Sequence, residues 1–520
     1  MAPAARTRSA VPRTALAVAL ALCLPACGKP VGSGGGERKN LVVVVLDTLR
    51  PDRLGAYGYD RGTSPHLDAW AEHAVVFERA HSTSPWTTPS LISLLTSLEP
   101  SVHGILMYPE PGRLDERITT LAEVLRERGW TTAAFTEGGY AKPQFGLDQG
   151  FEVFPTNEGD ELGHKSPMDH PSRIASNMDR TLAWLEQHRD QPFFLLFHTY
   201  EVHEPYRPPL EVLRRFRPDY DQQAEHARLD AIVARWNTER VVDEEDALLF
   251  IRHVKHCVLA GRPDLQAPGE FLMALNAYCP GNDFNQVLAQ GEALAFIDDL
   301  YDAGVAYADE QLARLWAALE RDGLADDTVV VVVSDHGEAL GEHGYVGHGL
   351  TLFGVMTRIA LLLRAPGIEP GRNGELVRMI DVMPTLLDLL DVDGARLPLQ
   401  GKSLVPWLEG GRPEPLAYGF GVNQQGEELF WHSIRSARWL YVEDHKRGRH
   451  WLYDTVADPG ETTDVATEHP EVVAGLAREL RQRIEADAAL RARLGVQVES
   501  SDLSAEDLEE LRRLGYAGDR

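Results

Sequence analysis

The sequence predicts a doubly wound α/β fold, in which helices cover both faces of a mostly parallel sheet. Apolar runs rich in Val, Leu and Phe predict strands buried on both faces, at 41–46, 193–197 and 329–333. Stretches with a helical period lie around them, at 120–128, 174–188 and 301–321. Strands that alternate with helices are typical of this fold class.

Two regions depart from this alternation. Residues 210–294 are charged and largely helical in pattern, which predicts an insertion in a main domain of residues 40–396 and a possible lid. From 397 the chain is rich in Gly, Pro and aromatic residues. Strand-like pieces at 428–432 and 439–443 and a helical stretch at 471–488 follow. We therefore expect a smaller C-terminal α+β subdomain over 397–520, with a terminal helix that begins near Ser504.

The N-terminus has the order of a secretory signal. A basic start is followed by an apolar run from Thr14 to Leu22, too short to span a bilayer. Leu24-Pro25-Ala26-Cys27 resembles the lipobox of bacterial lipoproteins. We predict a signal peptide over 1–26, a lipid on Cys27 and a flexible tether over 27–39, which would hold the protein on the periplasmic side of a bacterial membrane or at the cell surface. The alternative is an ordinary signal peptide with an incidental Cys.

Composition and charge restrict the partners. The 520-residue chain is 43% hydrophobic and 25% charged, and its formal net charge is −28. Such a charge argues against a nucleic-acid partner, because phosphate contacts need clustered Lys and Arg. An anionic substrate stays possible if a bound cation reverses the local field. Cys257 and Cys279 could form a disulfide in an exported protein or stay as buried thiols.

Polar residues follow the predicted strands where each strand ends. Asp47 follows the first, His198 follows the Phe-rich strand, and Asp335-His336 follow the Val-rich strand. In open α/β sheets, functional sites gather at the carboxyl ends of the strands. Two carboxylates and an imidazole suit a divalent cation. The alternative for a single Asp in such a place is a helix N-cap.

Five segments, in the same order, resemble blocks of the sulfatase family within the alkaline phosphatase superfamily. They cover most of residues 40–490 apart from the insertion, and lie at 45–58, 86–104, 193–209, 301–349 and 452–459. The most specific contains Ser334-Asp335-His336-Gly337-Glu338. The resemblance implies an alkaline-phosphatase-like α/β fold and a metal-dependent hydrolase of sulfate or phosphate esters, with an anionic ester as substrate.

One position departs from the sulfatase pattern in a way that changes the chemistry. Where the family carries Cys or Ser in Cys/Ser-x-Pro-Ser-Arg, this chain has Thr87 before Pro89-Ser90, and Leu91 replaces the Arg. Thr cannot be oxidised to the aldehyde formylglycine. We therefore expect no formylglycine, and predict that Thr87, coordinated to the cation, is itself the nucleophile. The alternative is that Thr87 only caps the helix that follows.

The resemblance also assigns the remaining site residues. It predicts one divalent ion (Ca²⁺, Mg²⁺, Mn²⁺ or Zn²⁺), and the ligands implied for it are Asp47, Thr87, Asp335 and His336. His203 and His348 lie where the family contacts the substrate and protonates the leaving group. Arg50 could add positive charge for the substrate. A second ion could use His198, Glu201 and His343.

Several family residues are missing. Thr136-Glu137-Gly138-Gly139-Tyr140 replaces a block that carries a substrate-binding Lys, and no acidic residue precedes Arg358 in Phe353–Ala360. Two alternatives to a hydrolase therefore stay open. One is a transferase that moves a phospho-headgroup, and the other is a lipoprotein that keeps the fold for binding and has lost catalysis.

Overall fold

An eight-stranded mixed sheet forms the centre of the computed structural model. The structure describes residues 38–106, 112–155, 173–243, 291–349, 351–410, 419–425 and 429–501, with single positions within 245–249, 288–289 and 503–507. The strands run in the order β10-β2-β9-β5-β1-β4-β3, and β8 pairs with β2 at one end. Their bounds are β1 (Asn40–Leu46), β2 (Val75–His81), β3 (Thr131–Phe135), β4 (Phe193–Thr199), β5 (Thr328–Ser334), β8 (Arg358–Ile359), β9 (Leu361–Arg364) and β10 (Gly371–Arg378).

The predicted strands form the parallel heart of this sheet. β1 pairs in parallel with β5 on one side and with β4 on the other, and β3 extends the parallel set. β9 runs antiparallel to both β5 and β2, which makes the sheet mixed. The predicted doubly wound, mostly parallel sheet is confirmed.

Both faces of the sheet are buried. Alternate β1 side chains point to opposite cores, Val42 and Val44 to one and Val43 and Val45 to the other. This explains why the strand is a continuous apolar run. The first core contains side chains of α1 (Pro65–Ala71), α5 (Arg173–His188), α6 (Leu210–Phe216), α7 (Gln222–Glu239) and α11 (Gly291–Arg321). The second contains side chains of α2 (Thr87–Thr96), α3 (Pro100–His103), α4 (Leu121–Glu127), α13 (Val382–Leu389) and α14 (Val405–Leu408).

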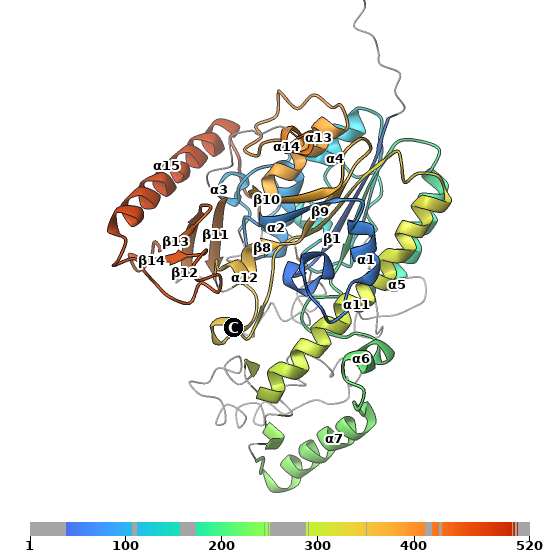
Figure 1. Cartoon of the computed structure of the whole chain (residues 1–520), viewed down its shortest axis with the longest axis vertical. Coiled ribbons are helices and arrows are strands. Elements are labelled where there is room, and N and C mark those ends of the chain that lie inside the picture. Colours follow the sequence, from blue (N-terminus) through green and yellow to red (C-terminus); the bar gives the residue numbers. More distant parts are fainter. Residues whose placement is uncertain are drawn as a thin grey trace, which may run out of the picture. The chain divides into compact units, whose positions relative to one another are not determined.

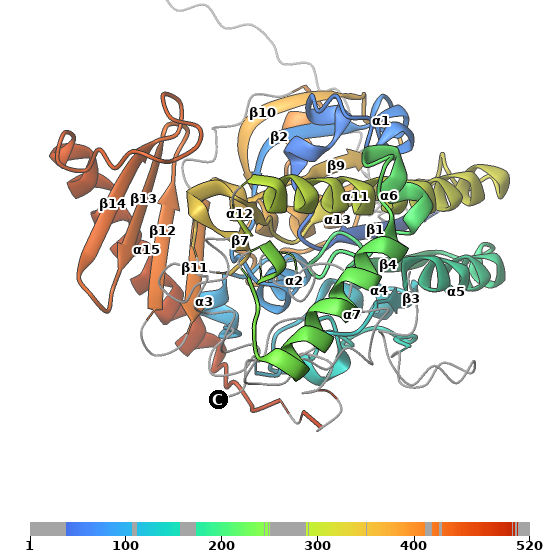
Figure 2. The same cartoon turned by 90° about the horizontal axis from the view of Figure 1, so that it is seen from below.

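The long helix α11 lies beside α1, α5 and α6, as both views of the fold show (Figures 1 and 2). It begins at Gly291, ten residues before the predicted start at Tyr301, so the last part of the predicted insertion belongs to it. α6 and α7 are the described helices of that insertion. Cys257 and Cys279 lie outside the described residues, as do the predicted signal peptide over 1–26 and the predicted tether over 27–39 except for its last two residues.

A second, antiparallel sheet follows in the chain, as expected for the C-terminal subdomain. Its order is β11-β12-β13-β14, with bounds Gly419–Gln425, Leu429–Arg435, Trp439–Asp444 and Arg449–Asp454. α15 (Pro470–Leu494) packs on it through Leu476 and Leu480, against Ile434 and Tyr441 (Figure 1). Ser504 and Asp507 make the reciprocal bonds of a helix start, and the predicted terminal helix beyond them lies outside the described residues.

None of the described helices combines the length and the apolar character that a membrane-spanning segment needs.

Candidate active site

The carboxyl ends of β5, β1 and β4 bring the predicted metal ligands together. Leu46 is in register with Ser334 on one side and with Thr199 on the other, so the residues beside these positions meet at one sheet edge. Asp47, His198 and Asp335 each contribute a ligand atom to a group whose atoms lie within 4.8 Å of one another. All three side chains are fully buried. The predicted meeting of Asp47 and Asp335 therefore occurs, and His198 joins them at the same point.

Backbone amides hold the Asp335 carboxylate in place. Its Oδ1 accepts hydrogen bonds from the amides of Thr48 (3.1 Å) and His336 (2.8 Å). Thr48 has a left-handed backbone, with φ of 57°, which turns the chain directly after Asp47. Gly337 keeps the next turn tight, because a Cβ there would lie 2.3 Å from the carbonyl oxygen of Val355. The hydrogen bond from Thr48 to Asp335 thus connects the loop after β1 with the loop after β5.

Several ligand atoms of this cluster lack hydrogen-bond partners. Among the described residues no hydrogen bond reaches Asp47 Oδ1, Asp335 Oδ2 or either ring nitrogen of His198, although all are buried. Burial and the neighbouring charge of Asp335 raise the pKa of Asp47 well above its usual range. A buried carboxylate oxygen without a donor costs free energy, and a bound cation removes that cost. These residues therefore fit a divalent metal ion.

Thr87 lies against this cluster. Its Oγ1 donates to Asp47 Oδ2 at 3.1 Å and lies 3.5 Å from His336 Nε2. The N-cap of α2 is Trp86, and Thr87 is the first residue inside the helix, so its hydroxyl does not cap α2. The contacts therefore do not support the alternative that Thr87 serves only as a helix cap. Thr87 is 1% exposed, and its hydroxyl lies against the predicted metal ligands.

The His336 ring is oriented by the loop it starts. Its Nδ1 lies 3.0 Å from the Gly337 carbonyl oxygen, so Nδ1 carries the proton that is donated there. In the neutral form of this ring Nε2 carries the lone pair, and it lies 3.6 Å from Asp335 Oδ2 and 3.8 Å from Asp47 Oδ1. This tautomer suits a metal ligand.

The two histidines predicted to contact substrate lie next to this cluster. The ring of His348 lies 4.8 Å, between centroids, from the rings of both His203 and His336. Trp86, before Thr87, contacts the His348 ring edge-on at 5.5 Å. Burial lowers the pKa of His203 to about 4, so this imidazole is neutral near pH 7. The structure thus brings His203, His348 and Thr87 to one place.

Sequence reasoning missed Glu338 as a functional residue. His348 Nδ1 lies 3.1 Å from Glu338 Oε1, and the Tyr206 hydroxyl donates to Glu338 Oε2 at 2.6 Å. Burial and the charge of Glu204 raise the pKa of Glu338 well above its usual range. Glu204, Glu338 and His348 also bring ligand atoms within 4.8 Å of one another. The signal was present in the sequence, since Glu338 completes the Asp335-His336-Gly337 segment.

Arg50, predicted to add positive charge for the substrate, forms ion pairs with carboxylates. Its guanidinium pairs with Asp52 and with Glu342, each at 2.7 Å, and donates to the Glu338 carbonyl oxygen at 3.1 Å. Two carboxylates thus already balance its charge, and its role toward substrate stays a prediction. His343 stacks on Phe353, with ring centroids 4.0 Å apart.

Two of the residues predicted for a second ion lie elsewhere than expected. His198 belongs to the cluster of Asp47 and Asp335. Glu201 is buried, and burial together with the charge of Glu137 raises its pKa well above the usual range. Glu137, where the family block suggests a Lys, accepts hydrogen bonds from Thr199 Oγ1 (2.6 Å) and the Tyr200 amide (3.0 Å). It therefore supports the end of β4.

A family model described as Sulfatase matches residues 39–392 of this chain. The chain belongs to the sulfatase family. Choline-sulfatase of Rhizobium meliloti is 25% identical over 472 residues, which cover 82% of each chain. Human iduronate 2-sulfatase is 25% identical over 461 residues, 73% of this chain and 78% of the relative.

A solved structure of the phosphonate monoester hydrolase of Agrobacterium radiobacter has the same fold. It superposes with a TM-score of 0.64 at 22% identity and covers 88% of this chain and 96% of that chain. The predicted alkaline-phosphatase-like fold is confirmed. As a member of the sulfatase family the protein is a hydrolase of ester bonds, and enzymes of this family use a divalent metal ion.

Proposed function

We propose that the protein hydrolyses phosphate or phosphonate esters with Thr87 as the nucleophile. The observation that carries this proposal is the contact of Thr87 Oγ1 with Asp47 Oδ2, inside a cluster of buried carboxylates and imidazoles. A hydroxyl in that place has an acceptor for its proton 3.1 Å away. Asp47, Asp335 and His336, with Thr87, would hold the divalent ion.

The threonine argues for phosphoryl rather than sulfuryl chemistry. A formylglycine enzyme releases its sulfate ester when a hemiacetal collapses, and threonine has no second hydroxyl for that route. A threonine ester must instead be opened by water at phosphorus or sulfur. Attack of water at phosphorus is the established reaction of the phosphatase branch of this superfamily, as the resemblance implies. We therefore assign the phosphate side, although the relatives above carry sulfatase names.

The residues then take the following parts. The bound cation supplies positive charge that favours the deprotonated hydroxyl and the charged ester oxygens. Thr87 Oγ1 forms a bond to phosphorus while the bond to the leaving oxygen breaks, and the Thr87 proton passes to Asp47. His348, held by Glu338, donates a proton to the leaving oxygen. Water then attacks phosphorus and passes a proton to His348, while the Thr87–phosphorus bond breaks and Thr87 Oγ1 takes back its proton from Asp47.

The test compares aryl phosphate, aryl phosphonate and aryl sulfate esters for wild type, Thr87→Val and Thr87→Ser. Valine keeps the shape without the hydroxyl, and serine keeps the hydroxyl. We expect phosphate turnover to fall by about 10³-fold in Thr87→Val and to persist in Thr87→Ser. Acid quenching should trap a phosphoryl group on Thr87. Wild-type turnover by Thr87→Val, or a marked preference for aryl sulfate, would overturn the proposal.

We also propose that the protein is an exported lipoprotein anchored through Cys27. The support is the order of a basic start, an apolar run and a lipobox-like segment in the first 27 residues. Expression with a radiolabelled fatty acid should label wild type but not Cys27→Ser, and only wild type should partition into detergent. Label retained in Cys27→Ser would contradict the assignment.

A further inference from the structure

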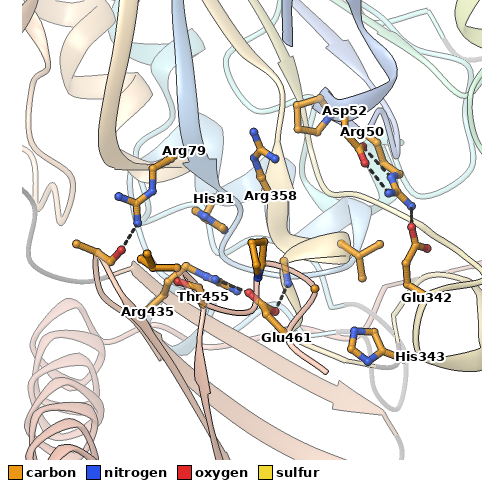
Figure 3. A pocket seen from close by; sticks show the side chains of 17 residues that line it. Arg50, Asp52, Arg79, His81, Glu342, His343, Arg358, Arg435, Thr455 and Glu461 are labelled. Atoms are coloured by element: carbon orange, nitrogen blue, oxygen red, sulfur yellow. Dashed lines mark hydrogen bonds and ion pairs between the residues drawn. The ribbon is translucent and has the colours of Figure 1, made fainter. Parts of the chain in front are cut away.

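Apart from the candidate active site, a pocket lined by several charged side chains lies between the main sheet and the C-terminal sheet. It has a volume of about 650 Å³, and its walls come from β2 and β8 on one side and from β12 and the loop 455–461 on the other (Figure 3). Arg50, Asp52 and Glu342 form one end of it. Thr87 and the metal-ligand cluster are not among its lining residues.

Arginines from separate strands converge on this pocket. Arg79 comes from the end of β2, Arg358 from β8 and Arg435 from β12 (Figure 3). The register of β2 and β8 places Arg358 opposite His81, so that strand pairing fixes two of these side chains beside the same imidazole. Arg435 reaches them because the two sheets are connected here, for example by the bond from Arg79 Nη2 to the Ala437 carbonyl oxygen (2.7 Å).

Carboxylates do not balance this positive charge. Among the described residues, the hydrogen bonds of Arg79 and Arg358 go to backbone carbonyl oxygens, those of Ala437 and Glu78. In the described part of the chain neither forms an ion pair with a carboxylate. Arg435 pairs with Glu461 at 2.6 Å through one nitrogen, but its buried Nη2 has no hydrogen-bond partner among the described residues. Arg435 is 7% exposed, so the missing partner costs free energy.

The nearby acidic groups are already engaged. Asp52 and Glu342 both pair with Arg50, Glu78 pairs with Arg372 at 2.7 Å, and Glu461 also accepts from the Gly354 amide at 2.6 Å. The acidic residue expected before Arg358 is absent, since Gly354 and Val355 stand there. The chain thus keeps excess positive charge at one place while its net charge is −28.

The pKa shifts of groups in the pocket agree with this excess of positive charge. Burial, followed by the charges of Arg435, Arg358 and Arg79, lowers the pKa of His81 well below its usual range. The pKa of Arg79 is lowered as well, by burial and then by Arg435, although Glu375 acts in the opposite direction. Groups that repel protons in this way attract an anion.

We propose that this pocket binds a tetrahedral oxyanion, phosphate or sulfate, between Arg79, Arg358 and Arg435, separately from the catalytic site. Guanidinium groups match such oxygens in geometry and charge, and Arg435 has a nitrogen to offer. The oxyanion can be the free inorganic ion or the charged group of a larger ester, because the chemistry of recognition is the same. The pocket would then act as an anion site beside the catalytic edge.

The experiment measures binding of inorganic sulfate and phosphate to the full chain by calorimetry, with chloride at equal ionic strength as reference. A phosphorylated sugar serves as the larger ester. Metal-free Thr87→Val protein is used, so that turnover is excluded. We expect saturable binding of oxyanion over chloride, weakened at least tenfold in Arg79→Gln/Arg358→Gln. Tighter binding of the phosphorylated sugar than of phosphate would identify the ester as the source.

Arg438→Gln is the matched control, because Arg438 lies between β12 and β13, is not a lining residue of the pocket, and pairs with Asp454. It should bind like the parent. Circular dichroism checks the fold, and if the double variant does not fold, the single Arg79→Lys and the thermal shift of wild type in sulfate replace it. Equal binding by all variants, a thermal shift no larger than in chloride, or loss of the binding in Asp47→Asn but not in the arginine variants would overturn the proposal.

Discussion

The catalytic edge and the arginine pocket are two charged regions of opposite character in one chain, the first buried and the second partly open to solvent. At the catalytic edge, Asp47 and Asp335 lie close together with ring nitrogens around them, and each carboxylate has an acceptor oxygen without a partner among the described residues. In the pocket, Arg79, Arg358 and Arg435 are lining residues, and the buried nitrogen of Arg435 that has no partner among the described residues is a donor. The first arrangement requires a cation and the second an anion.

This contrast shows that net charge says little about a particular site. A charge of −28 argues against a nucleic-acid partner, yet strand pairing still gathers arginines in one pocket. The two regions also touch through Arg50, whose guanidinium donates to the Glu338 carbonyl oxygen while it pairs with Glu342 at the pocket. The loop after β5 therefore contributes to both.

The largest effect should come from neutralising one carboxylate at the catalytic edge. Asp47→Asn removes a charge that holds the cation and the acceptor of the Thr87 proton, so we expect ester hydrolysis to fall by about 10³-fold. In metal-free protein the same change should raise the melting temperature, because Asp47 and Asp335 no longer repel each other. Asp60→Asn, at an exposed position, is the control. Unchanged metal affinity in a calorimetric titration would exclude Asp47 as a ligand.

The next change decides which imidazole serves the cation. His336 has its Nε2 lone pair toward the carboxylates, whereas His198 Nε2 lies 3.3 Å from Asp47 Oδ2. We expect metal affinity to fall about 100-fold in His336→Gln and about tenfold in His198→Gln, where only the orientation of Asp47 is affected. Titration with Mn²⁺ and Zn²⁺ measures both. The reverse order would replace His336 by His198 in the ligand set.

The sequence was sufficient for the sheet and for part of the site. Strands β1, β4 and β5 are continuous apolar runs, and residues after parallel strands must meet at one edge, so Asp47 and Asp335 could be paired in advance. His198 was considered only for a possible second ion, because the apolar runs do not reveal the strand order β5-β1-β4 that places it beside Asp47. Strands β2, β3, β8, β9 and β10 of the same sheet were not predicted.

The arginine pocket could not be predicted from the sequence. Its residues lie on strands far apart in the chain, and they meet only through the β2–β8 register and the packing of the C-terminal sheet. A single Arg in a sequence usually marks a solvated surface. The one hint was the missing acidic residue before Arg358.

A pH titration sharpens the comparison from the pocket side. His81 has a folded-state pKa well below the unfolded value of about 6.5, so the unfolded chain binds the proton first and stability falls as the pH drops below that value. In His81→Asn this loss should be absent, which makes the variant less acid-sensitive by up to about 2 kcal/mol at pH 5. Denaturant unfolding between pH 8 and 5 measures it. Sulfate should reduce the pH dependence in wild type, and parallel curves for both proteins would refute the assignment.

The smallest effect comes from the carboxylate that competes with the anion. Glu461 holds Arg435 at 2.6 Å, so Glu461→Gln should leave Arg435 available and raise sulfate affinity about three- to tenfold. The variant should melt at a lower temperature in sulfate-free buffer, because a buried guanidinium has lost its counter-charge. Sulfate should then restore more stability than in wild type, since the anion supplies that charge from the other side. Asp454→Asn, which removes the partner of Arg438 instead, should show neither change. If Glu461→Gln is destabilised but gains no affinity, Arg435 does not face the anion, and the site contracts to Arg79 and Arg358.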